Sequence, residues 1–379
     1  MDRPRLLYVI ESLGRGGAER ALLNLIPHVI RNGYQVQIVA LTSPSELLKD
    51  FENAGAEVIN LNFGQKWNLF KNINLLASLV RDQKPALIHA HLFFAGLYVG
   101  LSKYFGLKQP KFITFHNLAY APGCNPRNTS FYLRKLLNRH VVKHCMDRRI
   151  AVSSAVAEHY AESLGISLES FDIIPNGLPI PERVDKVPKK TTPEKIRIVA
   201  LGRLVKEKDY DYLLVAFAKL GQKYPGRFQL QVIGGGPLHD DLQLQARKLQ
   251  IDVDFSGSMA YAEAQTVLAE ADIFVTASIF EGFGLSVAEA MLAGVPVVAT
   301  NVGGIRDIVR PQFAEIVAPR QPEALAEAVS RVAALSETER EQRVKAAREF
   351  VEQHFSVESV AARLADLYRQ QLKEAQASG

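Results

Sequence analysis

The sequence has little cysteine and no long hydrophobic run, and each shortage excludes a class of protein. Only two of its 379 residues are cysteine, Cys124 and Cys145, which is too few for a disulfide framework or a cysteine-based zinc site. The amino-terminal hydrophobic run, Leu6 to Ile10, is too short for a signal peptide. The longest apolar stretch, residues 87–105, is divided by two histidines into a strand and a helix. We therefore expect a protein of the reducing cytoplasm with no membrane-spanning segment.

The composition is that of a globular protein with more than one domain. Hydrophobic residues make up 47% of the 379-residue chain, and this length and core content favour two domains. The formal net charge is +5, which indicates an anionic partner such as a phosphate ester or a lipid surface without choosing between them.

Short β-branched runs alternate with amphipathic stretches in two separate series. The first series, before residue 154, is LLYVI, YQVQIVAL, AEVINL, ALIHAH, KFITFH and RRIAVS. The second is IRIVALG, RFQLQVIG, VDFSG, DIFVTA, VPVVAT and AEIVAP. Strands that alternate with helices are typical of a doubly wound parallel sheet. The sequence thus predicts an α/β protein with two such sheets.

A proline-rich stretch and a terminal helix complete the predicted organisation. Residues 178–195 contain Pro179, Pro181, Pro188 and Pro193 among charged residues, which excludes a helix and indicates an interdomain linker. Near the end of the chain, one predicted helical face carries Val357, Val360, Ala361, Leu364, Leu367 and Tyr368. A helix with such an apolar face must dock on a domain.

Ligands of open α/β sheets bind beyond the carboxyl ends of the strands, so the loops that follow the strands hold the candidate residues. Gly14, Gly16 and Gly17 follow the first strand; they suit an anion at a helix N-terminus, and a plain tight turn explains them equally well. A dinucleotide-binding motif would require glycine at position 19, where this chain has glutamate.

The second series of strands opens with a loop that carries two cations. Arg203 and Lys208 lie between a strand and a helix, where they could clamp a diphosphate or form an ordinary solvated loop. The next loop contains Gly234, Gly235 and Gly236, and we expect it to let a flat base lie against the backbone.

The stretch EGFGLSVAEA, residues 281–290, places two glutamates eight positions apart at the start of a helix. A capping box, with Ser286 as N-cap and Glu289 reaching back, would explain Glu289 alone. It leaves Glu281 and the Gly282–Gly284 turn unexplained, and we expect the backbone N–H groups of residues 283–285 to face a ligand.

Histidines end two strands of the first series. His116 could contact a sugar hydroxyl or move a proton, or serve only the structure. His89 and His91 point to one side of an extended strand, and no third metal ligand is evident. Two Asp-x-Asp sequences, at 209–211 and 252–254, are explained by the start of a helix and of a strand, so we expect no metal site.

Several motifs together resemble a known family. In order, they are GGAER, FHN, PNG at 175–177, GRLxxxK at 202–208, GGGP, and EGFGLSVAE followed by AMLAGVPVVAT. They resemble the GT4 family of retaining glycosyltransferases over nearly the whole chain. The resemblance implies the GT-B fold, in which two Rossmann-like domains face a central cleft. It implies an acceptor-binding domain at 1–182, a donor-binding domain at 183–355, and a helix at 356–379 packed back on the first domain.

The resemblance also implies roles for single residues. Glu289 would bind the ribose hydroxyls, Arg203 and Lys208 the diphosphate, and Glu281 would lie near the donor sugar, which His116 faces. The implied catalytic residues are His116, Glu281, Arg203 and Lys208, and the further donor-binding residues are Gly16, Gly17, Asn176, Gly234, Phe283, Gly284, Leu285 and Glu289. The chain departs from the family pattern at Pro27, which interrupts the first helix, at Asp209, where glycine is usual, and at Asp307, where glutamate is commoner.

The function expected from this resemblance is transfer of a sugar from a nucleoside-diphosphate sugar, such as a UDP-sugar, to a hydroxyl of a glycan or lipid-linked acceptor. Cell-surface polysaccharide, lipopolysaccharide and glycolipid synthesis are the pathways in view. We expect no cofactor, no metal requirement and no nucleic-acid partner. The alternatives are a sugar-nucleotide 2-epimerase of the same fold and a non-catalytic binding module.

The most basic segment of the chain, residues 131–149, raises the question of membrane contact. Read as a helix, it places Leu133, Leu136, Leu137 and Val141 on one side, with Arg134, Lys135, Arg139 and Lys143 around the rest. An interfacial helix on anionic lipid at the inner face of the cell membrane has this pattern, as does a helix packed on the sheet with a solvated basic face.

Overall fold

The computed structural model describes residues 3–122, 128–181 and 195–377. Cys124 and most of the predicted linker at 178–195 lie outside these residues. The chain divides into two compact units: unit 1 is Met1–Pro179 with Phe355–Gly379, and unit 2 is Ile180–His354.

Unit 1 is built on a parallel sheet of seven strands in the order β3-β2-β1-β4-β5-β6-β7. The strands are β1 (Arg5–Ile10), β2 (Gln35–Ala40), β3 (Glu57–Asn60), β4 (Leu87–His91), β5 (Lys111–Phe115), β6 (Arg148–Ala151) and β7 (Phe171–Ile173). Six of them coincide with the first predicted series. The seventh, β7, was not predicted because three residues at a sheet edge are too few to show a hydrophobic period.

The helices of unit 1 are α1 (Gly17–Arg31), α2 (Leu48–Asn53), α3 (Leu69–Gln83), α4 (Phe93–Leu101), α5 (Thr129–His144), α6 (Ser154–Leu164) and α14 (Val357–Ala377), with short 3₁₀ turns η1 (Ser102–Phe105) and η2 (Leu168–Ser170). The expectation that Pro27 interrupts the first helix is wrong, because α1 runs through Pro27. Proline costs the helix one backbone N–H hydrogen bond. The helix persists because its buried apolar stripe, which includes Leu22, Ile26 and Val29, packs on the sheet.

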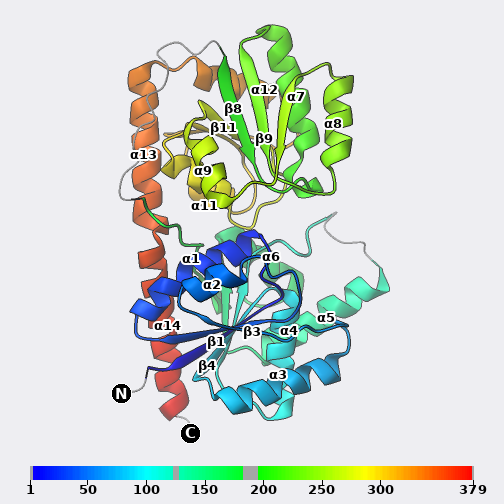
Figure 1. Cartoon of the computed structure of the whole chain (residues 1–379), viewed down its shortest axis with the longest axis vertical. Coiled ribbons are helices and arrows are strands. Elements are labelled where there is room, and N and C mark those ends of the chain that lie inside the picture. The colour runs from blue at the N-terminus through cyan, green and yellow to red at the C-terminus, as the bar shows by residue number, and fades with distance from the viewer. Residues whose placement is uncertain (1–2, 123–127, 182–194, 378–379) are drawn as a thin grey trace. The chain divides into compact units, whose positions relative to one another are not determined.

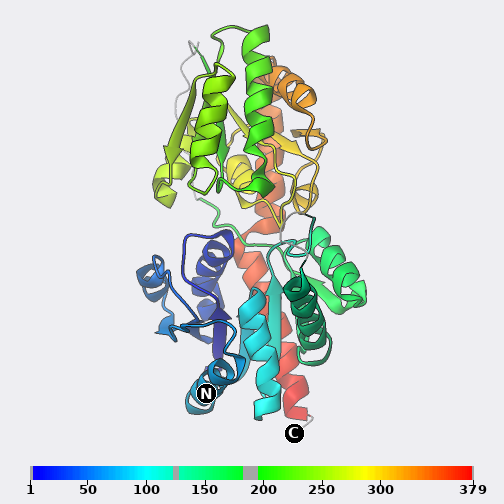
Figure 2. The ribbon, with the colours of Figure 1, turned by 90° about the vertical axis from the view of Figure 1, so that its right-hand side faces the viewer.

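Two helices far apart in sequence cover one face of the unit 1 sheet. In Figure 1 and Figure 2, α14 lies along this sheet, and its residues Val360, Leu364 and Tyr368 belong to the same buried cluster as α1. On the opposite face, α4 approaches so closely that a Cβ on Gly96 would meet Ile113. The predicted apolar face of the terminal helix is therefore the face that it buries in unit 1.

Unit 2 repeats the same winding with a parallel sheet of six strands in the order β10-β9-β8-β11-β12-β13. The strands are β8 (Ile196–Leu201), β9 (Phe228–Ile233), β10 (Val253–Gly257), β11 (Ile273–Thr276), β12 (Val297–Thr300) and β13 (Ala314–Val317). The helices are α7 (Tyr210–Lys223), α8 (His239–Lys248), α9 (Tyr261–Ala269), α10 (Leu285–Leu292), α11 (Ile305–Ile308), α12 (Pro322–Ala333) and α13 (Glu337–Phe355), with the 3₁₀ turn η3 (Lys206–Lys208). All six strands coincide with the second predicted series.

In each sheet the strand order reverses once, and the reversal locates the ligand-binding crevice. In unit 1 the reversal lies between β1 and β4, and in unit 2 it lies between β8 and β11. Adjacent connections leave such a point in opposite directions, so a crevice opens there at the carboxyl ends of the strands. The loops after these four strands therefore mark the candidate site of each unit.

Candidate active site

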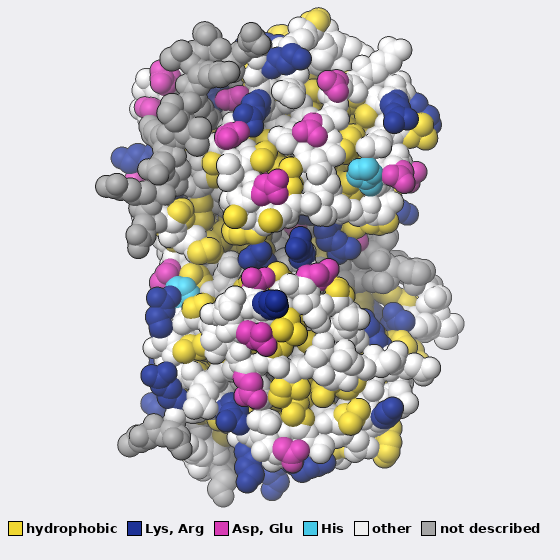
Figure 3. Space-filling model, viewed as in Figure 1, with side chains coloured by type: hydrophobic (Ala, Val, Ile, Leu, Met, Phe, Trp, Pro, Cys, Tyr) yellow, Lys and Arg dark blue, Asp and Glu magenta, His cyan; other side chains and the backbone are white. Residues whose placement is uncertain are grey.

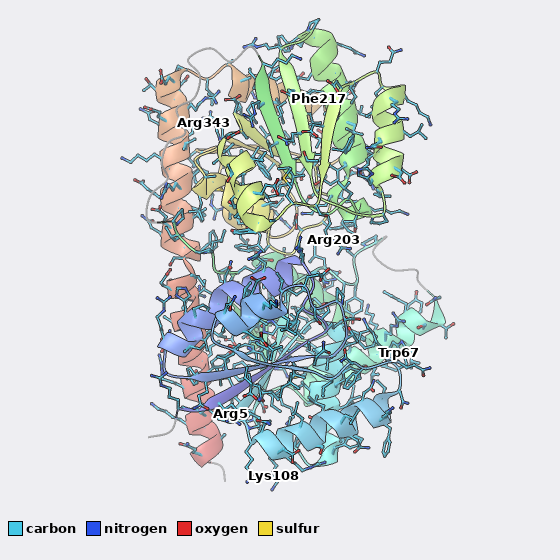
Figure 4. All side chains as sticks on the ribbon, viewed as in Figure 1. Arg5, Trp67, Lys108, Arg203, Phe217 and Arg343 are labelled. Carbon is cyan, nitrogen blue, oxygen red and sulfur yellow. The ribbon has the colours of Figure 1, made fainter. Side chains whose placement is uncertain are left out.

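The loop after β8 brings cations to the reversal point of unit 2. Arg203 is exposed two residues beyond the end of β8, at the carboxyl edge of the sheet (Figure 4). The chain then forms η3, which ends at Lys208, and α7 begins at Tyr210. The Tyr210 hydroxyl donates to the Gly202 carbonyl at 3.1 Å and ties the start of α7 to this loop.

The glycine loop after β9 packs against the Arg203 loop. The Gly202 and Leu204 N–H groups donate to the carbonyls of Ile233 and Gly235, each at 2.9 Å. A Cβ on Gly234 would lie 2.0 Å from the Gly202 carbonyl oxygen, so no larger residue fits. The role expected of these glycines is to make room for a base. Within unit 2 they allow the backbones of the two loops to pack closely, which fixes the position of Arg203.

Glu281 meets Lys208 at the same edge. The Lys208 ammonium contacts the Glu281 carboxylate, and their side chains are 20% and 14% exposed. The Ser278 hydroxyl, after β11, donates to the same carboxylate at 3.4 Å and lies 3.0 Å from the Thr276 hydroxyl. A lysine from the β8 loop and a glutamate from the β11 loop therefore form one charged pair at the reversal point.

Two glycines, Gly303 and Gly304, pack against the turn that carries Glu281. The Gly304 N–H donates to the Glu281 carbonyl at 2.9 Å, and a Cβ on Gly303 would lie 1.9 Å from that oxygen. Gly284, with φ of 106°, is the N-cap of α10. The capping-box explanation of Glu289 is therefore wrong, because Ser286 is not the N-cap.

Three further predicted donor-binding residues of unit 2 lie in this turn or in the helix that follows it. Leu285 is the first residue of α10, and Glu289 lies one turn inside it. The Phe283 side chain is buried, at 3% exposure, so a ligand contact at Phe283 would use its backbone. Position 209, where glycine is usual, holds aspartate with φ of 50°, a left-handed conformation that aspartate tolerates better than most residues.

Asp209 is buried and pairs with Arg320 across 3.5 Å. Burial raises the pKa of the Asp209 carboxyl, and the Arg320 guanidinium lowers it in part. The substitution at this position is thus accommodated by a partner from another loop, and Lys208 keeps its place beside Glu281.

Four of the predicted site residues lie in unit 1. Gly16 is the N-cap of α1 and Gly17 its first residue, directly after the β1 loop. His116 follows β5, and Asn176 follows β7. His116 and Asn176 line one small cavity of about 30 Å³ together with His89, His91 and Thr114.

The histidines around this cavity are neutral at physiological pH. Burial lowers the pKa of His116 to about 4 and that of His89 to about 3. The pKa of His91 is also lowered, first by burial and then by its histidine neighbours. His116 therefore acts here as an uncharged hydrogen-bonding group.

Two further members of this cluster, Tyr368 and Thr114, were not predicted to contact His89, although Tyr368 lies on the predicted buried face of the terminal helix. Tyr368 of α14 bonds to His89 through its hydroxyl and to the Tyr8 hydroxyl at 2.8 Å. Thr114 of β5 lies 2.7 Å from His89 Nε2. The alternation of His89 and His91 predicted that both lie on one side of β4, but no local pattern could identify a tyrosine 279 residues away.

Within the described residues, no group of three or more histidine, cysteine, aspartate or glutamate side chains is arranged to hold a metal ion. Over those same residues, no helix is both long and apolar enough to cross a membrane.

The basic segment at 131–149 differs from the expectation. Its helix, α5, ends at His144, and Arg148 and Arg149 begin β6. Val141 is buried, whereas Leu133 and Leu136 are 65% and 64% exposed, so the end of α5 packs on unit 1 and these two leucines near its start do not.

Further exposed apolar side chains of unit 1 lie on α5 and on other elements. Tyr132 is on α5, and the others are Trp67, Phe70, Leu75, Tyr104, Leu168 and Ile173. The Arg134 guanidinium lies over the Trp67 ring at 4.8 Å, which joins α5 to the loop before α3. Figure 3 shows hydrophobic and basic side chains side by side at the surface of unit 1 near α3.

The two halves of the sequence match two family models. Residues 182–376 match glycosyl transferases group 1, and residues 15–180 match glycosyltransferase family 4. The chain is 30% identical to the GPI3 subunit of phosphatidylinositol N-acetylglucosaminyltransferase from Saccharomyces cerevisiae, over 48% of this chain and 41% of that protein. It is 28% identical to glycogen synthase from Mycobacterium tuberculosis, over 76% of this chain and 69% of that protein. The match thus spans less than half of the yeast relative.

Solved structures share the fold. The Anabaena protein HepE, solved with UDP and glucose, has a TM-score of 0.81 at 19% identity and covers 97% of this chain and 100% of that one. Sucrose-phosphate synthase from Thermosynechococcus elongatus has a TM-score of 0.81 at 20% identity and covers 98% of this chain and 100% of that one. The predicted fold class, GT-B with two doubly wound parallel-sheet domains, is confirmed.

Proposed function

The chain belongs to the glycosyl transferases group 1 family, and from this premise we propose that it is a retaining enzyme that moves a sugar from a nucleoside-diphosphate sugar to a hydroxyl of a glycan or lipid-linked acceptor. The observation that carries the proposal is the Lys208–Glu281 pair at the strand reversal of unit 2, with Arg203 in the same loop as Lys208. In this proposal unit 2 binds the donor and unit 1 the acceptor.

The charges of unit 2 suit the breaking of a sugar–phosphate bond. As that bond breaks, negative charge grows on the diphosphate and positive character grows on the anomeric carbon. Arg203 and Lys208 stabilise the negative charge on the diphosphate, and the Glu281 carboxylate stabilises the positive character of the anomeric carbon. Such preorganised charges are effective because they lie where charge develops in the transition state. The acceptor hydroxyl attacks the face that the diphosphate leaves, and a leaving phosphate oxygen takes its proton. No covalent enzyme intermediate and no metal ion enters this scheme.

Two other functions use the same donor site and differ in their products. A sugar-nucleotide 2-epimerase would change the sugar of the donor without any acceptor. A non-catalytic module would bind the nucleotide sugar and release no nucleoside diphosphate. Membership of a transferase family favours transfer over both.

We further propose that the acceptor is reached at an anionic membrane surface, on the cytoplasmic side. The support is the exposed surface of unit 1 on α5, where Tyr132, Leu133 and Leu136 stand beside Arg139 and Lys143. Apolar side chains that flank cations are the usual composition of an interfacial surface. Acceptors in polysaccharide, lipopolysaccharide or glycolipid synthesis would fit such a location.

The donor can be identified by thermal unfolding with UDP-glucose, UDP-galactose, UDP-N-acetylglucosamine and GDP-mannose. At about 100 times its Kd, a ligand stabilises the folded protein by about 2.7 kcal/mol, which corresponds to roughly 5–10 °C in Tm for a unit of this size. We expect one of the four to give this shift and Glu289→Ala to abolish it. Glu327→Ala, an exposed change on α12, is the matched control. No shift with any of them would contradict the proposed donor class.

A further inference from the structure

In unit 1 the buried ring of His91 is joined directly to the half-buried ring of His116. His91 Nδ1 lies 2.9 Å from His116 Nε2, and the two ring planes differ by 27° with their centroids 5.2 Å apart. His91 ends β4 and is 3% exposed, and His116 follows the neighbouring strand β5. The sheet therefore fixes both ring positions before any ligand arrives.

A hydrogen bond between two neutral imidazoles requires one proton in the gap between them. A neutral imidazole has one N–H donor and one acceptor nitrogen. If His91 Nδ1 carries the shared proton, the other proton of the pair is on His116 Nδ1. If His116 Nε2 carries it, the other is on His91 Nε2. The tautomer of His116 is therefore coupled to that of His91.

The two outward nitrogens have no partner among the described residues. Both His91 Nε2 and His116 Nδ1 are buried without a hydrogen bond, although buried polar atoms are rarely left so. The cavity that both rings line, about 30 Å³, has room for one or two water molecules at roughly 10–15 Å³ each. His116 Nδ1 is thus closed off from solvent, and the half-buried His116 ring can meet a ligand only with the edge that stays accessible.

From this geometry we propose that His91 is a positioning residue, which holds the His116 ring and its tautomer so that the accessible edge of the ring faces the reacting sugar. His91 itself does not touch the sugar. The proposal depends on the proposed function in one respect, which is that the ligand facing His116 is the transferred sugar.

Charge and neighbouring groups are consistent with a neutral pair. The titratable groups in contact with His91 are His89, with ring centroids 4.5 Å apart, Tyr8, at 5.7 Å, and His116 itself. None of these is an acid that would draw a second proton onto the pair, and burial keeps the pKa of both histidines low. The 2.9 Å bond thus holds one proton near neutral pH.

The first test replaces His91 by residues that mimic one ring nitrogen or neither. An asparagine amide occupies the place of Nδ1, a glutamine amide that of Nε2, and leucine keeps only the volume. We expect His91→Leu and His91→Gln to lower kcat by about 10- to 100-fold, as when the partner that orients a functional histidine is lost. His91→Asn should restore most of kcat, and the Kd of the donor should not change in any variant. Equal losses in the asparagine and leucine variants would overturn the proposal.

The second test needs no substrate, so it separates a failure of this proposal from a failure of the proposed function. Long-range ¹H–¹⁵N spectra of ¹⁵N-histidine-labelled protein report the tautomer of each ring. We expect His116 to be a single tautomer in the wild type and in His91→Asn, and a mixture in His91→Leu. Thr114→Val, which removes a partner of His89 instead, should leave His116 unchanged. A mixed His116 tautomer in the wild type, or no change in His91→Leu, would contradict the proposal.

Discussion

At the scale of single residues, the proposed sugar transfer depends on three charges at the carboxyl edge of the unit 2 sheet. Arg203, Lys208 and Glu281 come from loops after β8 and β11, and Lys208 and Glu281 are 73 residues apart in sequence. The sequence alone could predict that each of them follows a strand, because strand ends of a parallel sheet share an edge. It could not predict their contact, nor the pairing of Asp209 with Arg320, which depends on how distant loops pack.

The donor residues can be tested one at a time. Glu281→Gln should nearly abolish transfer without unfolding the protein, because this carboxylate is held by Lys208 and Ser278 at a loop and not in a core. Arg203→Ala and Lys208→Ala should each lower kcat on the order of 10²- to 10³-fold, the cost of one preorganised charge-stabilising group. Steady-state kinetics with the identified donor would measure these losses. A folded Glu281→Gln enzyme with near-normal turnover would remove Glu281 from the mechanism.

The buried histidines of unit 1 predict how stability depends on pH. Folding lowers the pKa of His89 to about 3 and that of His116 to about 4, whereas in the unfolded chain both titrate near 6.5. Between these values the unfolded state binds more protons, so the free energy of unfolding falls as pH drops below about 6.5. Above about pH 6.5 the two histidines are neutral in both states, and the folded protein has the full stability.

Urea unfolding at a series of pH values, followed by the fluorescence of the single tryptophan, Trp67 in unit 1, measures this dependence. Each histidine should contribute a slope of about 1.4 kcal/mol per pH unit within the window. His89→Asn should remove one such contribution between pH 4.5 and 6, while His140→Gln, which replaces an exposed histidine of α5, should not. The same slope in wild type and His89→Asn would show that His89 is not buried neutral.

At the scale of elements, long periodic segments could be predicted and short or capped ones could not. All six strands of unit 2 follow from short β-branched runs between helical stretches, and the buried face of α14 follows from its helical period. The edge strand β7 is too short for such a signal. The course of α1 through Pro27, and the N-cap of α10 at Gly284 instead of Ser286, were set by tertiary packing and by a left-handed turn.

Helix α5 carries the prediction of membrane contact. Replacing Leu133 and Leu136 by serine, together with Arg139 and Lys143 by glutamine, should weaken binding to anionic vesicles, since each cation near such a surface contributes about 1 kcal/mol. Co-sedimentation with phosphatidylglycerol and phosphatidylcholine vesicles, at low and physiological salt, measures this. Leu244→Ser, at a leucine of α8 in unit 2 that is 50% exposed, is the control. If the wild type binds neither vesicle, or binds both equally, α5 is scaffold only.

At the scale of the whole molecule, the chain forms two compact units and passes from one to the other near residues 180 and 355. We expect a bound nucleotide sugar to draw them together about these two connections, since closure of domains excludes water from the reacting groups. Small-angle X-ray scattering should then give a smaller radius of gyration at saturating donor than without it. An unchanged radius, in a sample shown by thermal shift to be saturated, would exclude such closure.

The central claim, transfer of a sugar from a nucleotide donor, is tested most directly by following both products. The enzyme is incubated with the identified nucleotide sugar, labelled in its sugar, and with a lipid and glycan extract as acceptor. We predict that nucleoside diphosphate is released in step with label entering the extract, that the new anomeric bond keeps the configuration of the donor by NMR, and that Glu281→Gln does neither. Release of an epimerised sugar without acceptor, or binding with no nucleoside diphosphate formed, would contradict the account.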